Sequence, residues 1–185
     1  LYQDLLNSAT PGDLRVALKA SEVDDADDHI ALQSRLQQWG LHIVPTNRDG
    51  DCFLHALIKM LALNTTTHQL RAILIQTLRK YQDEHVDAPG AHGTRTRLRE
   101  HRSPGCATWE DYLEKMSKPG EWCDEKMILA ACLYLKRQIV IVSSTTNVPV
   151  VWEPRWGVQT EGNPVVVGHY HERHYVGCLL YTSPS

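Results

Sequence analysis

One cysteine, Cys52, stands where a tight turn runs into an apolar stretch. The turn contains Asp49 and Gly50, and the stretch that follows, Phe53 to Leu61, is mostly apolar and of helical length. The first N–H groups of a helix have no partner inside the helix and carry roughly half a positive charge, so they favour a thiolate over a thiol. Glycine at Gly50 suits a turn with positive φ. This segment therefore has the features of a nucleophilic cysteine site.

A structural interpretation of the same segment stays open. Asp-Gly turns precede helices in many proteins, and a free cysteine is usually a small buried hydrophobic residue. The segment alone does not separate the two interpretations.

A second segment favours the catalytic one. Residues 165–181 have the pattern of two short β-strands joined by a polar hairpin, with His169, His171 and His174 in or beside it. A cysteine on an early helix and a histidine on a late strand are the two halves of a thiol–imidazole pair, distant in sequence and adjacent in the fold.

The motifs carry a family resemblance. Asp49-Gly50-Asp51-Cys52 resembles the Asp-Gly-x-Cys motif of the ovarian-tumour (OTU) family of cysteine deubiquitinases, and His174-Tyr175 resembles that family's late His-aromatic motif. The similarity covers about residues 41–181, with the middle section matched at residues 109–116, 120–122 and 128–142. The resemblance implies an α+β fold, a papain-like cysteine protease of OTU type with a mixed central sheet flanked by helices.

The resemblance also implies an activity. It is that of a thiol-dependent deubiquitinase, which removes ubiquitin or a ubiquitin-like modifier from lysine through an acyl-enzyme thioester, with no metal and no cofactor. Cys52 would be the nucleophile and His174 the general base. The backbone N–H groups of Gly50, Asp51 and Cys52 would stabilise the oxyanion.

Three further residues receive roles in the same way. Asp49 matches the motif aspartate of the active site, and we expect it to bond backbone N–H groups and hold the loop open rather than touch the histidine. Tyr175 and Trp122 are the expected substrate-binding residues, with ubiquitin or a ubiquitin-like protein as partner.

Two positions depart from the family pattern. Many members have Asp or Asn two residues after the histidine to orient the imidazole, whereas this chain has Val176, which cannot accept a hydrogen bond. Glu172, Asn163 and Asn147 are candidates for that role by nearness or type. Without a partner for His174, the chain would be a catalytically impaired module that binds ubiquitin. The other departure is Cys123, where glycine is more usual, and we expect only a local packing effect.

A zinc site is a rival interpretation of the histidines. His169, His171 and His174 form a His-x-His-x-x-His cluster, and alternate residues of a strand share a face. No Cys-x-x-Cys pair or carboxylate set accompanies the cluster, and the Cys52 turn would go unexplained.

Composition fits one enzyme domain over residues 1–185, with a helical N-terminal extension (1–40) and a core (41–181). The chain is 42% hydrophobic, which suffices for a core without disulfides or metal. The net charge of -3 excludes an overall basic nucleic-acid binder, and no apolar run approaches the roughly 20 residues of a membrane helix. Five scattered cysteines fit reduced thiols in a cytoplasmic or nuclear compartment, and we expect a monomer. The chain starts at Leu1 without a basic-then-apolar leader, so we expect a fragment of a longer protein.

The remaining pattern predicts the elements around the site. We expect short helices within residues 1–21, and an amphipathic helix with Ile30, Leu32, Leu36 and Trp39 on its apolar face. Capping residues 64–67 should begin a long helix that reaches Tyr81. Further helices are expected near residues 109–116 and 124–136, and strands at 41–44, 139–142, 148–152, 165–170 and 174–181. Residues 86–104, which collect Arg95, Arg97, Arg99 and Arg102, are expected to form a solvated loop or a partner-contact surface.

Overall fold

A five-stranded mixed sheet organises the chain. The computed structural model describes residues 26–87, 95–101, 103–170 and 174–180. The strands lie in the order β1-β7-β6-β4-β5, and their bounds are β1 Leu41–Val44, β4 Ile139–Ser143, β5 Val150–Trp152, β6 Val165–Tyr170 and β7 His174–Leu180. β4 and β6 are parallel and the other neighbours are antiparallel, which confirms the predicted mixed sheet.

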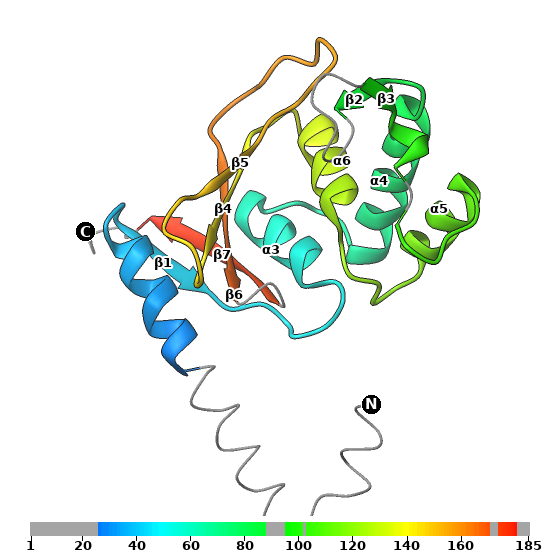
Figure 1. Ribbon diagram of the computed structural model, residues 1–185. Helices are drawn as coiled ribbons and strands as arrows, with labels where there is room; N and C mark the ends of the chain where they lie inside the picture. Colours follow the sequence, from blue (N-terminus) through cyan, green and yellow to red (C-terminus); the bar gives the residue numbers. More distant parts are fainter. Residues whose placement is uncertain (1–25, 88–94, 102, 171–173, 181–185) are drawn as a thin grey trace, which may run out of the picture.

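Helices cover both faces of this sheet (Figure 1). On one side lie α3 (Cys52–Leu61) and α6 (Glu125–Leu135), with α4 (Thr67–Tyr81) and α5 (Trp109–Ser117) outside them. On the other side lies the helix formed by residues 26–37. The larger hydrophobic core fills the α3 side and contains the buried hydrophobic residues of α3, α4, α5 and α6.

Side-chain caps explain where three of the helices begin. The hydroxyl of Thr66 accepts from the backbone N–H of Gln69, whose side chain returns the bond, so the predicted cap of α4 is confirmed. Thr108 and Asp111 form the same capping box before α5. The Asp124 carboxylate accepts from the first N–H groups of α6.

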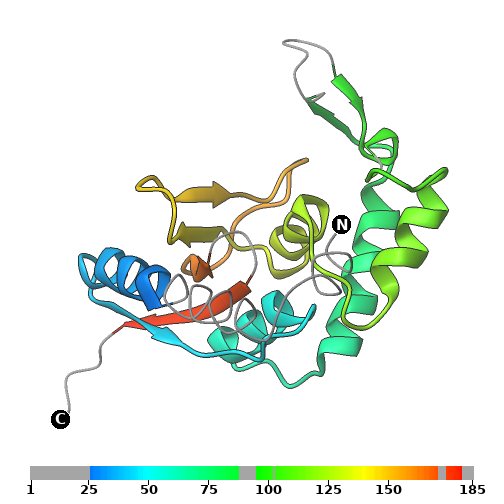
Figure 2. The same cartoon turned by 60° about the horizontal axis from the view of Figure 1, so that its bottom comes forward.

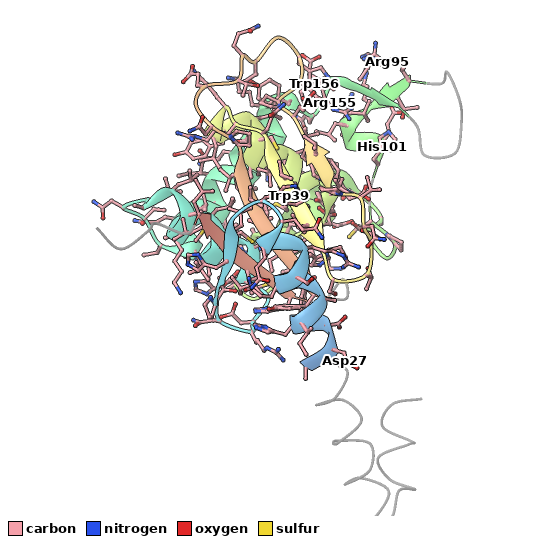
Figure 3. The ribbon with its side chains drawn as sticks, turned by 90° about the vertical axis from the view of Figure 1, so that its left-hand side faces the viewer. Asp27, Trp39, Arg95, His101, Arg155 and Trp156 are labelled. Carbon is pink, nitrogen blue, oxygen red and sulfur yellow. The ribbon has the colours of Figure 1, made fainter. Side chains whose placement is uncertain are left out.

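The helix over residues 26–37 seals a second, smaller core. Leu32 and Leu36 pack there with residues of three strands, namely Leu41, Val142, Val176 and Cys178. The expected apolar face is only half right, because Ile30 is 66% exposed and Trp39, which follows the helix, is 48% exposed (Figure 3). Leu32 and Leu36 alone supply the buried contact. The short helices expected within residues 1–21 lie outside the described residues.

The arginine-rich segment is not simply a loop. Residues His85–Asp87 (β2) and Arg95–Arg97 (β3) pair as an antiparallel ribbon, followed by a 3₁₀ turn, Leu98–Glu100. The ribbon projects from the body of the molecule (Figure 2), and Trp156 donates from its Nε1 to the carbonyl of His85 at 3.2 Å. Arg97 and Arg99 both lie against Asp83, so the described positive charges are partly paired. The segment was expected to be a solvated loop or arm, and the described part is an arm with strand structure (Figure 2). Arg102 lies outside the described residues, and partner contact stays a prediction.

Within the described residues, no helix is both long enough and apolar enough to cross a membrane.

Candidate active site

Cys52 is the first residue of α3 and lies at the junction predicted from sequence. Its Sγ accepts a hydrogen bond at 3.4 Å from the backbone N–H of Tyr175, the residue that follows His174 on β7. The thiol is thus held against the strand that carries the histidine. The structure brings together the two motifs, although 122 positions separate Cys52 from His174 in the sequence.

Burial raises the pKa of the Cys52 thiol above its usual value, and the nearby Asp49 carboxylate acts in the same direction. The N–H groups of Tyr175 and Phe53 act in the opposite direction without overcoming burial. This result is contrary to the expectation that the helix start alone favours the thiolate. The thiolate therefore needs a base, and His174, which precedes Tyr175 on β7, is the candidate.

The loop before Cys52 is held by Asp49. Its Oδ1 accepts from the Asp51 N–H at 2.9 Å, its Oδ2 lies 3.2 Å from His55 Nε2, and its backbone carbonyl accepts from the Cys52 N–H at 3.1 Å. Asp49 therefore acts inside the loop and the first turn of α3. Two of the three predicted oxyanion donors, those of Asp51 and Cys52, are engaged by Asp49 in this arrangement.

Gly50 is glycine for a reason that differs from the expected one. Its φ is not in the positive range, which the described glycines at 40, 105, 120, 157 and 162 adopt. Instead, a Cβ at Gly50 would lie 1.5 Å from the carbonyl oxygen of Gly120. The loop before Cys52 therefore touches the α5–α6 connection backbone to backbone, and only glycine fits there.

A buried arginine that the sequence analysis missed joins these two loops. Arg71, on α4, is 1% exposed, and its guanidinium binds the Asp51 carboxylate through Nε at 3.1 Å and through Nη2. The same group donates to the carbonyls of Gly50 at 3.4 Å, Met116 at 2.8 Å and Glu121 at 2.6 Å. Asp51 also accepts from the Gly120 N–H at 3.3 Å, and its side chain does not cap α3. The helical spacing of α4 gives no signal for this role, because one arginine on a helix resembles any other.

His174 is the first residue of β7 and is buried. Its Nε2 lies 3.4 Å from the hydroxyl oxygen of Thr46, and that hydroxyl donates to the carbonyl of Tyr175. Because the single hydroxyl hydrogen is given to the carbonyl, Thr46 can only accept from His174, which places a hydrogen on Nε2. The neutral ring then has Nδ1 as its basic nitrogen.

Thr46 therefore takes the position of the residue that orients His174. The candidates named from the sequence make other contacts or lie outside the described residues. Asn147 contacts Arg35 at 3.3 Å, Asn163 gives its backbone carbonyl to Arg137 at 3.0 Å, and Glu172 lies outside the described residues. Only its place six residues before Cys52 could have drawn attention to Thr46.

The sheet register argues against the zinc interpretation. Tyr170 pairs with His174 and His169 with Tyr175 across the β6–β7 hairpin. Directly opposed residues share a face and successive residues alternate, so His169 and His174 lie on opposite faces. His171 lies outside the described residues. No group of three metal-binding side chains is found among the described residues.

A cleft of about 520 Å³ lies next to Tyr175, the residue whose backbone N–H binds Cys52 Sγ. It is lined by Tyr175 and His169 from the sheet, by Trp152 of β5, and by Cys123 and Glu125 at the start of α6. Tyr175 is 7% exposed, and its ring stacks on His169 and meets Phe53 edge-on, so it forms a wall of the cleft. Trp122 is 50% exposed, next to Cys123 in the chain. Both remain predicted substrate-binding residues.

The other buried thiols do not compete with Cys52. Burial raises the pKa of Cys123, Cys132 and Cys178 to about 12 in each case. Cys106 is partly exposed, and all five cysteines are free. At neutral pH the three buried residues are therefore protonated, and Cys123 serves as packing beside the cleft.

Comparison with known proteins agrees with this geometry. A family model described as OTU-like cysteine protease matches residues 47–181. The OVARIAN TUMOR DOMAIN-containing deubiquitinating enzyme 11 of Arabidopsis thaliana is 30% identical over 135 residues, which cover 70% of this chain and 47% of that protein. This chain belongs to the family of OTU-like cysteine proteases, and it spans about half the length of that curated relative.

Solved structures share the fold. The OTU domain of OTUD1 superposes with a TM-score of 0.63 at 12% identity, covering 86% of this chain and 99% of that domain. The Hazara virus OTU domain, solved bound to ubiquitin, has a TM-score of 0.52 at 19% identity and covers 77% of this chain and 83% of that one. The predicted papain-like fold of OTU type is confirmed.

Proposed function

We propose that this chain is a cysteine isopeptidase that removes ubiquitin or a ubiquitin-like modifier from lysine side chains. The observation that carries the proposal is the contact between Thr46 and His174, the residue before the Tyr175 N–H that binds Cys52, because it supplies the imidazole orientation that Val176 cannot. The family match and the ubiquitin bound to the Hazara virus relative support the choice of substrate. The catalytically impaired alternative rested on Val176, and the contact between Thr46 and His174 supports the active enzyme over it.

The reaction proceeds by proton and acyl transfer. His174 takes the thiol proton at Nδ1, and Sγ of Cys52 attacks the carbonyl carbon of the modifier's C-terminal glycine. The tetrahedral intermediate collapses as the C–N bond breaks and the imidazolium gives its proton to the departing lysine amine. Water, deprotonated by His174, then attacks the thioester and releases the carboxylate with the regenerated thiol.

The oxyanion requires donors that Asp49 now engages. When a carbonyl oxygen reaches the loop, the N–H groups of Asp51 and Cys52 must turn from Asp49 to the substrate, each donor contributing roughly 3 to 4 kcal/mol in related acyl-transfer sites. The cleft between Trp152 and Tyr175 holds the extended C-terminal tail of the modifier. A reducing compartment, cytoplasmic or nuclear, keeps the thiol active.

The direct test is reaction with ubiquitin that carries an electrophilic C-terminus. We expect one covalent adduct, mapped to Cys52 by peptide mass spectrometry, and none with Cys52→Ala. Cys52→Ala should also reduce turnover of a fluorogenic ubiquitin amide by about 10⁴-fold or more while its thermal unfolding stays near that of the parent. Turnover by Cys52→Ala near the parent rate would exclude the thiol mechanism. Ubiquitin binding without an adduct would favour the binding module.

A further inference from the structure

Three aromatic rings, those of His29, Tyr170 and His174, form a series from the helix over residues 26–37 to the catalytic histidine. The ring of Tyr170 is parallel to that of His174, with 6.1 Å between centroids and 4° between planes. Tyr170 also stacks with His29, with 6.0 Å between the ring centroids. The Nδ1 atom of His29 lies 2.8 Å from the Tyr170 hydroxyl oxygen. His29 belongs to the helix over residues 26–37, outside the part of the chain that the family model matches.

The sheet and the helix together produce this series. Tyr170 and His174 are directly opposed in the β6–β7 register, so their side chains share the face that the helix covers. His29, Leu32 and Leu36 are spaced by three and four residues, which places them on one side of the helix. Because Leu32 and Leu36 are buried in the smaller core, His29 is directed toward the same face of the sheet.

Close packing at Gly168 keeps the helix over residues 26–37 near β6. A Cβ at Gly168 would lie 2.8 Å from Leu32 Cδ2 and 2.8 Å from Val176 Cγ2. Position 168 is two residues before Tyr170 and therefore faces the helix too. A side chain there would lift Leu32 away from β6, and with it the turn that carries His29.

The helix has a second anchor near the cleft. Arg35 Nη1 donates to the Ser143 carbonyl at 2.5 Å, and its Nε donates to Asn147 at 3.3 Å. Ser143 belongs to β4 and lines the cleft. One helix thus contacts both the histidine side of the site and the β4–β5 connection, so its position along the sheet is defined at both ends.

We propose that Tyr170 is a positioning residue for His174, and that the helix over residues 26–37 holds it through His29. The inference rests on the proposed function, since His174 must act as the base. The Tyr170 ring restricts rotation of the imidazole, and a parallel aromatic face stabilises the imidazolium that forms when the Cys52 proton is transferred. Burial raises the pKa of Tyr170 to about 12, so its hydroxyl is neutral and can bond His29.

The test compares ring loss with hydroxyl loss. Tyr170→Leu removes the stack and should lower kcat about tenfold with KM within twofold, because positioned acid–base groups contribute about 10² to 10⁴ and only orientation is lost. Tyr170→Phe keeps the ring and should stay within about twofold of the parent, and His29→Ala should lose about two- to threefold. Tyr134→Leu is the matched control, since Tyr134 is a half-exposed tyrosine on α6.

A second readout does not require ubiquitin cleavage. The rate of Cys52 alkylation by iodoacetamide at pH 7, in a Cys106→Ser background, should fall in Tyr170→Leu by about the same factor as kcat. Tyr170→Leu equal to Tyr134→Leu in kcat and in alkylation would overturn the proposal. If even the parent cleaves no ubiquitin, the proposed function fails, and the alkylation rates still decide the role of Tyr170. If Tyr170→Leu does not fold, Tyr170→Met replaces it, because methionine fills the space without a ring.

Discussion

The two sides of the central sheet hold the two halves of the candidate active site by different means. On the α3 side, the loop before Cys52 is held by polar contacts that converge on Arg71 and Asp51. On the other side, His174 lies near the Thr46 hydroxyl and stacks with Tyr170, which the amphipathic helix over residues 26–37 contacts through His29. The nucleophile therefore depends on a few buried, directional bonds, whereas the base depends on packing that several weaker contacts share.

This difference predicts unequal sensitivity to mutation. A buried ion pair that loses one partner leaves an uncompensated charge. Substitutions that break the contacts around Cys52 should therefore cause a large loss of stability and turnover. His174 is held by a hydroxyl, a ring and a helix, so the loss of any one of these contacts should lower turnover by a smaller factor. The four predictions below test that contrast, beginning with the largest expected effect.

Arg71→Met should be the most damaging of these substitutions. It leaves the Asp51 carboxylate and the backbone carbonyls of Gly50, Met116 and Glu121 without this donor, which should lower the free energy of unfolding by about 3 to 5 kcal/mol. The displaced loop should reduce kcat about 100-fold or more, since oxyanion donors move with it. Chemical denaturation and steady-state cleavage of a fluorogenic ubiquitin substrate measure both effects.

Arg79→Met is the control for that experiment. Arg79 lies on the same helix but is exposed and pairs with Glu110 at 2.8 Å, so its loss should cost less than about 1 kcal/mol. Arg71→Met and Arg79→Met with equal stability and turnover would show that the loop does not depend on the buried arginine.

His174→Ala separates the contribution of the base from that of the helix start. Because the Cys52 pKa is raised, less thiolate is present at a given pH than for an ordinary thiol of pKa about 8.5. Without His174, we expect alkylation of Cys52 at pH 7 to fall about 30-fold or more, and to rise about tenfold per pH unit until the raised pKa is passed. Iodoacetamide rates from pH 6 to 10 in the Cys106→Ser background measure this. A pH-independent fast reaction in His174→Ala would mean that the end of α3 alone holds a thiolate.

The sequence was informative where chemistry is tied to a short motif. Cys52 and His174 were predicted with their elements because a helix start and a strand have recognisable local patterns. The sheet strands were predicted for a related reason, since β-branched runs such as Ile139 to Val142 leave few alternatives.

The supporting residues had no such local pattern. Arg71 is one of several arginines, and its role appears only when α4 brings it under the loop before Cys52 and the α5–α6 connection. Thr46 acts through a hydroxyl two residues after the end of β1, and its partner is 128 positions away. Gly50 was selected for the approach of Gly120 rather than for its own dihedral angles. Each of these is a tertiary contact, which sequence periodicity does not encode.

Thr46→Val tests the hydroxyl at the histidine with almost no change of shape. Valine keeps the volume and removes the hydroxyl oxygen that lies 3.4 Å from His174 Nε2. We expect kcat to fall about tenfold, and stability to change by about 1 kcal/mol for the lost bond to the Tyr175 carbonyl. Thr46→Ser, which retains the hydroxyl, should stay within about threefold. If valine and serine give the same turnover, His174 is oriented without Thr46.

Val176→Asn is expected to have the smallest effect on turnover, and it bears most directly on how the base is held. Val176 is 2% exposed and packs with Leu32 and Leu36 under the helix, so the family's usual acceptor would have to enter an apolar core. Burying the amide without partners should cost about 1 to 3 kcal/mol, whereas Val176→Ala gives the cost of lost packing alone.

Turnover by Val176→Asn should be similar to that of the parent or lower, because Thr46 already accepts from Nε2 and a second acceptor has nothing to add. A tenfold gain would instead mean that His174 is poorly oriented in the parent, and that Thr46 and Tyr170 do not replace the missing residue. The informative measurement is therefore kcat for Val176→Asn in the parent and in Thr46→Val. Rescue confined to Thr46→Val would show that position 176 can still provide the acceptor and that Thr46 has made it unnecessary.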